Sequence, residues 1–330
     1  MNLSDNKKQM LDLAEKLGMP ASEFGDTLDL LRLNEIHIVD MLPEMLLMIR
    51  SIIAEETFIY RRKPINSVKK GLLFSFHNIF SHATDDHQNQ DDEKLLHIQP
   101  HIRITPFHLE SKVVFPKGST ITQITILIDL DFLKLFIGKD QELFGYLFND
   151  EKTLLIEEFM SPEMADLVNE IAGIKEWGIL SQAYYKLKAL ELLYLLFNNL
   201  SKRQHIKHQN LRSDEIAALY RVRDAVSSSL KRPLTHDELA KISGMNVLKL
   251  RKLFTQIFGK GIYEYSQYIR MQEAAILMKD KHLSVSETGY QLGFINLSYF
   301  GRLFEQHFGM KPKKWSAEQR SKAQEQKYRY

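Results

Sequence analysis

Apolar residues recur with two different spacings, which divide the chain into a strand-rich part and a helical part. Between about residues 36 and 128, short runs rich in Ile, Val, Leu, Phe and Thr alternate with polar breaks, a pattern typical of β-strands. Beyond residue 130 the apolar positions recur every three or four residues, the spacing of amphipathic helices. We therefore expect an α+β chain, with strands first and helices last.

The strand-rich part contains several runs with the length and composition of strands. They are Met45–Arg50, Thr57–Arg61, Gly71–Ile79, His101–Phe107, Lys112–Phe115 and Ser119–Ile128. Several short strands in about 95 residues predict a small antiparallel barrel or sandwich. Lys7–Gly18 has helical spacing and is expected to form either a short packing helix or a frayed leader. The polar, acidic stretch Ser81–Glu93 predicts an exposed or disordered loop.

Helices are expected after the strands. Phe132–Phe148 has helical spacing, and Ser161 followed by Pro162 is typical of a capped helix start. Along Ile179–Asn199 the apolar residues alternate at spacings of three and four, the seam of a coiled coil. The seam residues are Leu180, Ala183, Leu187, Leu190, Tyr194 and Phe197. This helix predicts a dimer interface, and the alternative is a core helix buried within one subunit.

The last third of the chain contains one helical pattern twice. Thr235 with Glu238, and Ser284 with Glu287 at an offset of 49 residues, each form a capping box that opens a short helix. Each short helix ends at a glycine, which tolerates a left-handed turn, and a longer helix follows. The two glycines are Gly244 and Gly293. The pattern therefore predicts two helix-turn-helix units in tandem.

The longer helix of each unit, here called the reading helix, has an apolar stripe opposite a polar face. Leu250–Gly259 corresponds to Phe300–Gly309 at an offset of 50 residues. The stripes expected to be buried are Leu250, Leu253, Phe254 and Ile257, and Phe300, Leu303, Phe304 and Phe308. Exposed polar side chains near a helix N-terminus suit base edges and phosphates in the major groove. The candidate DNA-contacting residues are Leu248, Lys249, Arg251, Lys252, Ser298, Tyr299 and Arg302.

One helix, Ile262–Lys279, is expected between the two units. Its roughly 18 residues would span about 27 Å at the rise of an α-helix. With end turns added, it can place the reading helices roughly 34 Å apart, about one turn of duplex DNA. The alternative is an all-α repeat whose lysines and arginines are ordinary solvated side chains.

This segment resembles the DNA-binding domain of the AraC/XylS family of bacterial transcription regulators. Val285–Phe294, Ser298–Phe304 and Phe308–Pro312 are similar to the family signature. Gly289 departs from it, because members usually have Ala there, and glycine is expected to loosen the helix by roughly 1 kcal/mol. Gly244–Leu250 is similar to a subgroup that includes regulators of siderophore-iron uptake, so an iron-siderophore is one candidate effector.

The resemblance implies a domain organisation and a function. The expected parts are a cupin-like ligand-sensing domain (1–160), a helical dimerisation region (161–200), a linker (201–212), the DNA-binding domain (213–318) and a disordered tail (319–330). The implied function is a sequence-specific transcription regulator, with activation as the expected sign, controlled by a small molecule in the N-terminal domain. Expected partners are double-stranded promoter DNA, the small-molecule effector, RNA polymerase and a second copy of the chain through Ile179–Asn199.

Charge and composition agree with this interpretation. Residues 211–330 hold 21 lysines and arginines against 12 acidic residues, a net of +9; the remaining 23 and 30 leave residues 1–210 at −7. A basic module joined to an acidic one is expected of a DNA-binding domain with a partner domain. The absence of cysteine excludes disulfides and Cys-based zinc sites, and the lack of a signal peptide or membrane span predicts a cytoplasmic protein.

Histidines in the strand-rich part are candidate metal ligands. They are His82, His87, His97, His101 and His108. The HxH pair that cupin metal sites usually have does not occur among them, so no bound metal or other cofactor is expected.

Two other functions are considered. One is a cupin-type enzyme with a DNA-binding appendage, but the sequence has no phosphate-cradling glycine loop, nucleophile elbow or HExxH motif. The other is a non-specific DNA- or RNA-binding protein. The aromatic-studded sheet signature of common RNA modules does not occur in the sequence.

Overall fold

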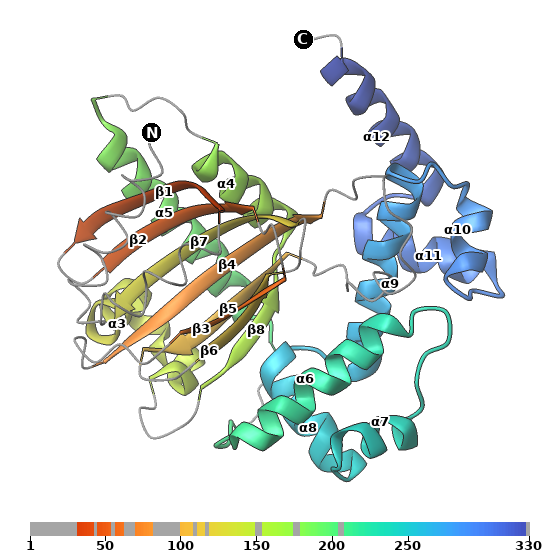
Figure 1. The fold of residues 1–330 in the computed structure, drawn as a ribbon, viewed down its shortest axis with the longest axis horizontal. Helices are drawn as coiled ribbons and strands as arrows, with labels where there is room; N and C mark the ends of the chain where they lie inside the picture. The colour runs from red at the N-terminus through yellow and green to blue at the C-terminus, as the bar shows by residue number, and fades with distance from the viewer. Residues whose placement is uncertain are drawn as a thin grey trace. The chain divides into compact units, whose positions relative to one another are not determined.

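In the described part of the chain, the strands up to Asp129 precede the helices, as the change in apolar spacing predicted, but one further strand, Ile156–Phe159, lies among the helices (Figure 1). The computed structural model describes residues 32–42, 45–53, 57–62, 70–81, 100–107, 111–115, 119–148, 154–173, 179–203 and 208–327. The predicted helix Lys7–Gly18 and all of the predicted loop except Ser81 lie outside these residues. The chain divides into two units, residues 1–212 and residues 213–330, and each is described by itself.

The first unit contains a six-stranded antiparallel sheet, in the order β1-β2-β7-β4-β5-β8, and a two-stranded sheet, β3-β6. The strands are β1 (Arg32–Leu42), β2 (Met45–Ile53), β3 (Phe58–Arg62), β4 (Gly71–Ser81), β5 (His101–Pro106), β6 (Ser111–Phe115), β7 (Ser119–Asp129) and β8 (Ile156–Phe159). Every predicted strand is present. The sequence analysis predicted neither β1 nor β8. In β8, two glutamates in four residues are unfavourable for a strand.

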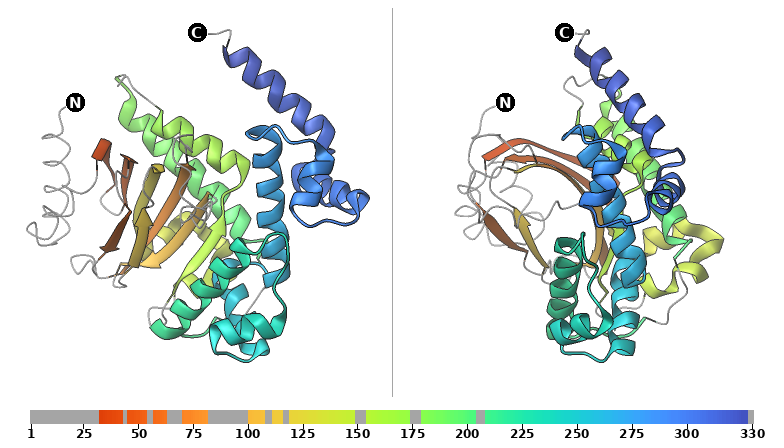
Figure 2. Two further views of the ribbon diagram at one scale, coloured as in Figure 1. Left: turned by 45° about the vertical axis from the view of Figure 1, so that its right-hand side comes forward. Right: turned by 90° about the vertical axis from the view of Figure 1, so that its right-hand side faces the viewer.

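The two faces of the larger sheet differ in chemistry. Alternate residues such as Leu47, Phe74 and Ile126 point to one face and join the hydrophobic core. Helices cover this face, and the two-stranded sheet lies on the other side (Figure 2). Helix α5 supplies Leu193 and Leu196 to the core. The antiparallel sheet with helices confirms the predicted α+β class.

The helices of the first unit are α3 (Leu130–Ile137), the 3₁₀ helix η2 (Gly138–Leu147), α4 (Pro162–Ala172) and α5 (Ser181–Leu200). The predicted single helix Phe132–Phe148 is divided at Gly138, whose φ of 64° ends α3 in a conformation that favours glycine. The predicted start of α4 is confirmed, since the Ser161 hydroxyl accepts a hydrogen bond from the backbone N–H of Met164.

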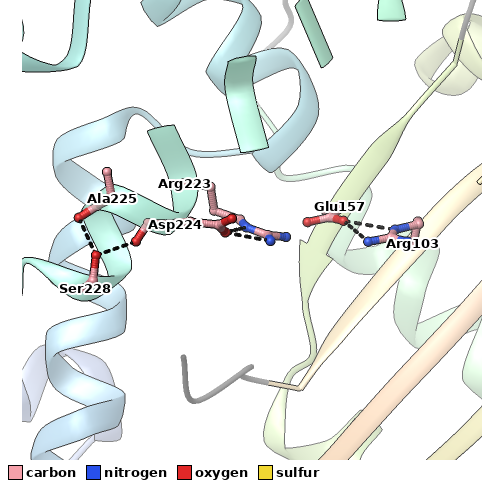
Figure 3. Close-up of polar contacts among 6 residues, drawn as sticks. All are labelled: Arg103, Glu157, Arg223, Asp224, Ala225 and Ser228. Atoms are coloured by element: carbon pink, nitrogen blue, oxygen red, sulfur yellow. Dashed lines mark hydrogen bonds and ion pairs between the residues drawn. The ribbon is translucent and has the colours of Figure 1, made fainter. Parts of the chain in front are cut away.

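The second unit is helical throughout its described residues. Its helices are α6 (Ser213–Ser228), α7 (His236–Ser243), α8 (Val247–Phe258), α9 (Ile262–Lys279), α10 (Val285–Gln291), α11 (Leu297–Phe308) and α12 (Pro312–Lys327). Both capping boxes form, and Gly244 and Gly293 have left-handed φ angles of 68° and 77°, as predicted. Figure 3 shows the C-terminal end of α6, where Asp224 accepts hydrogen bonds from Arg223 and the Ser228 hydroxyl donates to backbone carbonyls.

The predicted disorder of residues 319–330 is wrong for residues 319–327, because α12 continues to Lys327. The segment contains Ala, Gln, Glu, Lys and Arg, which all favour a helix. The ammonium of Lys314 lies 4.0 Å from the carboxylate of Glu318, one helical turn away, and this ion pair also favours the helix. The charge that suggested disorder is therefore the polar surface of a helix.

Gly293→Ala should destabilise the second unit far more than Gly309→Ala. Both residues have left-handed φ angles, 77° and 73°, but a Cβ at Gly293 would lie 2.0 Å from the Lys231 carbonyl oxygen, whereas Gly309 has open space. We expect a loss of about 1–2 kcal/mol at Gly309 and more than about 3 kcal/mol at Gly293. Urea unfolding followed by Trp315 fluorescence, in a Trp177→Phe background, measures both, and equal losses would contradict the steric explanation.

Candidate nucleic-acid interface

The two reading helices, α8 and α11, begin in the same way. The side-chain oxygen of Asn246 accepts a hydrogen bond of 2.8 Å from the backbone N–H of Lys249, and that of Asn296 accepts one of 3.0 Å from Tyr299. These caps satisfy backbone donors at the helix end and fix where each reading helix starts. The sequence analysis did not identify the asparagines, although their offset of 50 residues matches that of the helices.

The predicted division of each reading helix into a buried and an exposed side is confirmed. Leu250, Leu253, Phe254 and Ile257 of α8 are buried, and so are Phe300 and Phe304 of α11. Leu303 and Phe308 are half-buried against the same core. Since the stripes are held in the core, the opposite faces of α8 and α11 are directed to solvent.

All the candidate DNA-contacting side chains are exposed. They are Leu248, Lys249, Arg251 and Lys252 on α8, and Ser298, Tyr299 and Arg302 on α11. The first group lies on one helix and the second group on the other, so the structure does not bring the seven into one cluster. Each group occupies the N-terminal half of its helix, the part that enters the major groove in helix-turn-helix proteins.

Among these candidates, Lys249 and Tyr299 contact residues of other helices. The ammonium of Lys249 lies 2.6 Å from the Glu215 carboxylate on α6. The hydroxyls of Tyr299 and Tyr263 are 3.2 Å apart, and this hydrogen bond with Tyr263 is the main cause that raises the pKa of Tyr299. Periodicity within one helix cannot reveal such contacts, because both partners come from other helices.

Ile295 and Tyr263 are exposed beside the reading helices and were missed in the sequence. Ile295 is 97% exposed, directly before the cap of α11, and Tyr263 is 63% exposed at the start of α9. Ile295 precedes the helix, so no helical stripe could assign it to a face. Exposed apolar side chains at this end suit the methyl groups of thymine.

Helix α9 carries one buried arginine that organises the second unit. The Arg270 guanidinium is 2.8 Å from the Leu292 carbonyl oxygen and 3.8 Å from the centre of the Phe294 ring. Burial lowers the pKa of Arg270. The hydrogen bond and the stacking compensate part of this desolvation, and they tie α9 to the turn that precedes α11.

The glycine at position 289 has a packing reason that the sequence did not reveal. A Cβ there would lie 2.6 Å from Leu297 Cδ2 and 3.3 Å from the Phe300 ring. The Leu297 side chain therefore occupies the space that an alanine would need. The expected loosening of α10 stays a prediction, and this contact from α11 opposes it.

Metal ligands and membrane spans were also considered. Within the described residues, no group of three or more His, Cys, Asp or Glu side chains could hold a metal ion. His101, one of the histidines considered above, stacks on His77, and the others lie outside the residues whose side chains are described. None of the helices in the described part of the chain has both the length and the apolar character needed to cross a bilayer.

Comparison with known proteins gives similarity over the helical unit. A family model described as a helix-turn-helix domain matches residues 239–318. The chain is 33% identical over 92 residues to the uncharacterized HTH-type transcriptional regulator YpdC of Escherichia coli, covering 28% of this chain and 32% of that one. It is 29% identical over 133 residues to the HTH-type transcriptional activator RhaR of Salmonella schwarzengrund, covering 38% and 46%.

Among solved structures, a probable AraC family transcriptional regulator from Rhodopseudomonas palustris is 25% identical, covering 31% of this chain and 97% of that chain. Its TM-score of 0.29 is too low to support a comparison of folds. The chain spans less than half the length of the curated relatives described above. The similarity therefore concerns the helix-turn-helix part.

Acid should lower the stability of the second unit, because it protonates the glutamates of the capping boxes. Hydrogen bonds from Ser284 hold the pKa of Glu287 below its usual value of 4.5. A carboxylate whose pKa is lowered by folding stabilises the fold when the pH is above its unfolded-state pKa. This contribution is lost as the pH falls through its folded-state pKa. We expect the urea midpoint reported by Trp315 to fall below about pH 4.5, and to fall less in Glu287→Gln.

Glu318→Gln on α12 is the control, because its carboxylate takes part in no capping box. It should keep the acid dependence of the parent chain. If Glu287→Gln shows that same dependence, the capping carboxylate has no role in the acid sensitivity.

Proposed function

Since the chain belongs to the AraC family of transcription regulators by its domain at residues 239–318, we propose that it regulates transcription by binding a defined DNA sequence. The observation that carries this proposal is the pair of exposed basic surfaces, with Arg251 on α8 and Arg302 on α11, presented by two capped helices of one unit. Because α9 connects them, both helices can dock into successive grooves of one duplex.

The role of the first unit is the second part of the proposal. A small molecule bound there would change the arrangement or affinity of the DNA-binding units. Such control requires that the ligand bind one state more tightly than the other. We infer activation as the sign, through RNA polymerase, as the name of RhaR states for that relative, and we infer the cytoplasm as the location because the chromosomal DNA is there.

An exposed apolar stripe on α5 supports a dimer. Leu180, Leu187 and Tyr194 are 74%, 68% and 64% exposed, and their spacing of seven residues is that of a coiled-coil seam. Phe197, which the sequence pattern placed in the same seam, instead packs in the core, with its ring 4.9 Å from that of Phe144. The proposed interface therefore uses the part of Ile179–Asn199 before Phe197, and two linked DNA-binding units would gain affinity from bivalency.

Arg251→Ala should show whether Arg251 contributes to sequence-specific or to non-specific DNA binding. If its guanidinium is bidentate to guanine, the loss on a duplex selected from a random pool is about 1–3 kcal/mol, with little change on random DNA. Fluorescence anisotropy at fixed salt measures both affinities. Arg320→Ala, on the exposed surface of α12, should change neither, and equal weakening by Arg251→Ala on both duplexes would show a phosphate contact only.

Leu187→Glu should dissociate the proposed dimer. A carboxylate within an apolar seam would be desolvated without a partner, which favours the separate subunits. Leu135→Glu is the matched control, because Leu135 is 80% exposed on α3, outside the stripe. Sedimentation velocity should give a monomer for Leu187→Glu and a dimer for Leu135→Glu and the parent. Identical sedimentation of all three would contradict this interface.

A further inference from the structure

The turn before the second reading helix is one residue longer than the turn before the first, counted from the left-handed glycine to the capping asparagine. The first turn has one residue between these two positions, Met245. The second turn has two, Phe294 and Ile295. Met245 is half-buried and Phe294 is buried, so these two residues share the inward position. Ile295 is therefore the additional residue, and its side chain is 97% exposed.

Contacts on both sides of Ile295 fix its place. On one side, the backbone N–H of Phe294 donates to the Gly289 carbonyl oxygen at 2.9 Å, and the Arg270 guanidinium lies 3.8 Å from the centre of the Phe294 ring. On the other side, Asn296 caps α11. Isoleucine is branched at Cβ, which restricts its χ1 angle. The side chain therefore loses little conformational entropy when it packs against a ligand.

Exposed large hydrophobic side chains of the second unit gather at the reading helices. Among the described residues of this unit, they are Leu248, Tyr263, Tyr290, Ile295 and Tyr299. Leu248 and Tyr299 belong to the reading helices, the Tyr263 hydroxyl bonds to that of Tyr299, and Ile295 directly precedes the cap of α11. Apolar residues scattered singly over a surface are ordinary, but four that lie on or beside the reading helices favour a role in binding.

The neighbours of Ile295 determine what can cover it. Ser298, Tyr299 and Arg302 are exposed on α11, and the proposed function directs them to the major groove. Since Ile295 lies at the N-terminal end of the same helix, it reaches the groove together with them. An aliphatic side chain forms no hydrogen bonds, so it can distinguish bases only by their apolar groups. Among the groups that the four bases present in the major groove, the apolar one is the 5-methyl group of thymine.

We propose that Ile295 packs against the 5-methyl group of a thymine in the half-site bound by α11, and that it is a specificity-determining residue. This inference rests on the proposed function and adds one base to the DNA sequence that the regulator recognises. Burial of one methyl group contributes about fourfold in affinity. A cytosine or a uracil at the same position lacks this group, so the contact selects thymine.

The test uses the full chain and a duplex selected from a random-sequence pool, with the half-site of α11 located by footprinting. Uracil replaces each thymine of that half-site in turn, which removes the methyl group and keeps the base pair. Fluorescence anisotropy at fixed salt measures each affinity. We expect uracil at one position to weaken the parent chain about fourfold. Ile295→Ala should bind the thymine and uracil duplexes equally well.

The coupling between the two changes separates a direct contact from an indirect effect. If Ile295→Ala weakens binding to the thymine and uracil duplexes by the same factor, the side chain does not contact the methyl group. If Ile295→Ala binds every duplex like the parent chain, Ile295 takes no part in DNA binding. Either result would overturn the proposal.

Two controls accompany the variant. Leu135→Ala shortens another aliphatic side chain, which is 80% exposed on α3, and should keep the parent's sensitivity to uracil. The urea midpoint of Ile295→Ala should equal that of the parent chain, because an exposed side chain contributes little to stability.

A second selection provides an independent readout. With Ile295→Ala, a random-sequence pool should yield the same site, except that thymine is no longer enriched at the one position. Enrichment of thymine there to the parent's level would contradict the contact.

The same experiments distinguish this inference from the proposed function. A chain that selects no defined sequence loses the proposed function, and the inference fails with it. A chain that selects a defined site, but whose preference for thymine is the same with and without the Ile295 side chain, keeps the proposed function and loses only this inference.

Discussion

The packing of both helix-turn-helix units against one helix is the constraint on which the proposed interface depends. Helices α8, α10 and α11 all contact α9, and α9 buries side chains from Ile262 to Met278. A helix of 18 residues is about 27 Å long and does not stretch, so its length sets the distance between the reading helices. The Arg270 bond to the Leu292 carbonyl extends this constraint from α9 to the turn before α11. The exposed basic side chains are thus presented from a rigid frame.

In the first unit, the alternation of side chains along the strands gives the larger sheet two different faces. Residues such as Phe74 and Ile126 pack against α5 and stabilise the unit. The residues that alternate with them along the strands, such as the buried His77 and Thr125, lie on the opposite face. Polar groups buried there add to stability only where hydrogen bonds satisfy them, as they do between Arg103 and Glu157.

Local patterns in the sequence predicted much of the second unit. Capping boxes, glycines and apolar stripes lie within a few residues of one another, and both the start of α7 at Thr235 and the span of α9 are confirmed. What the sequence did not reveal depends on distant residues. The ion pair of Lys249 with Glu215 joins two helices, and the buried polar residues His77 and Thr125 can be assigned to one face of the sheet only when strand pairing is known. The helical residues 319–327 were missed because their charge was weighed above their helix propensity.

Hydroxyl-radical footprinting of the full chain, on a duplex selected from a random-sequence pool, tests the central claim most directly. If α8 and α11 enter successive grooves, each bound chain should protect two patches on the same face of the duplex, about 10 base pairs apart. Each patch should disappear separately when the basic residues of one reading helix are replaced. A single protected patch for each chain, or protection without a defined position, would contradict the account.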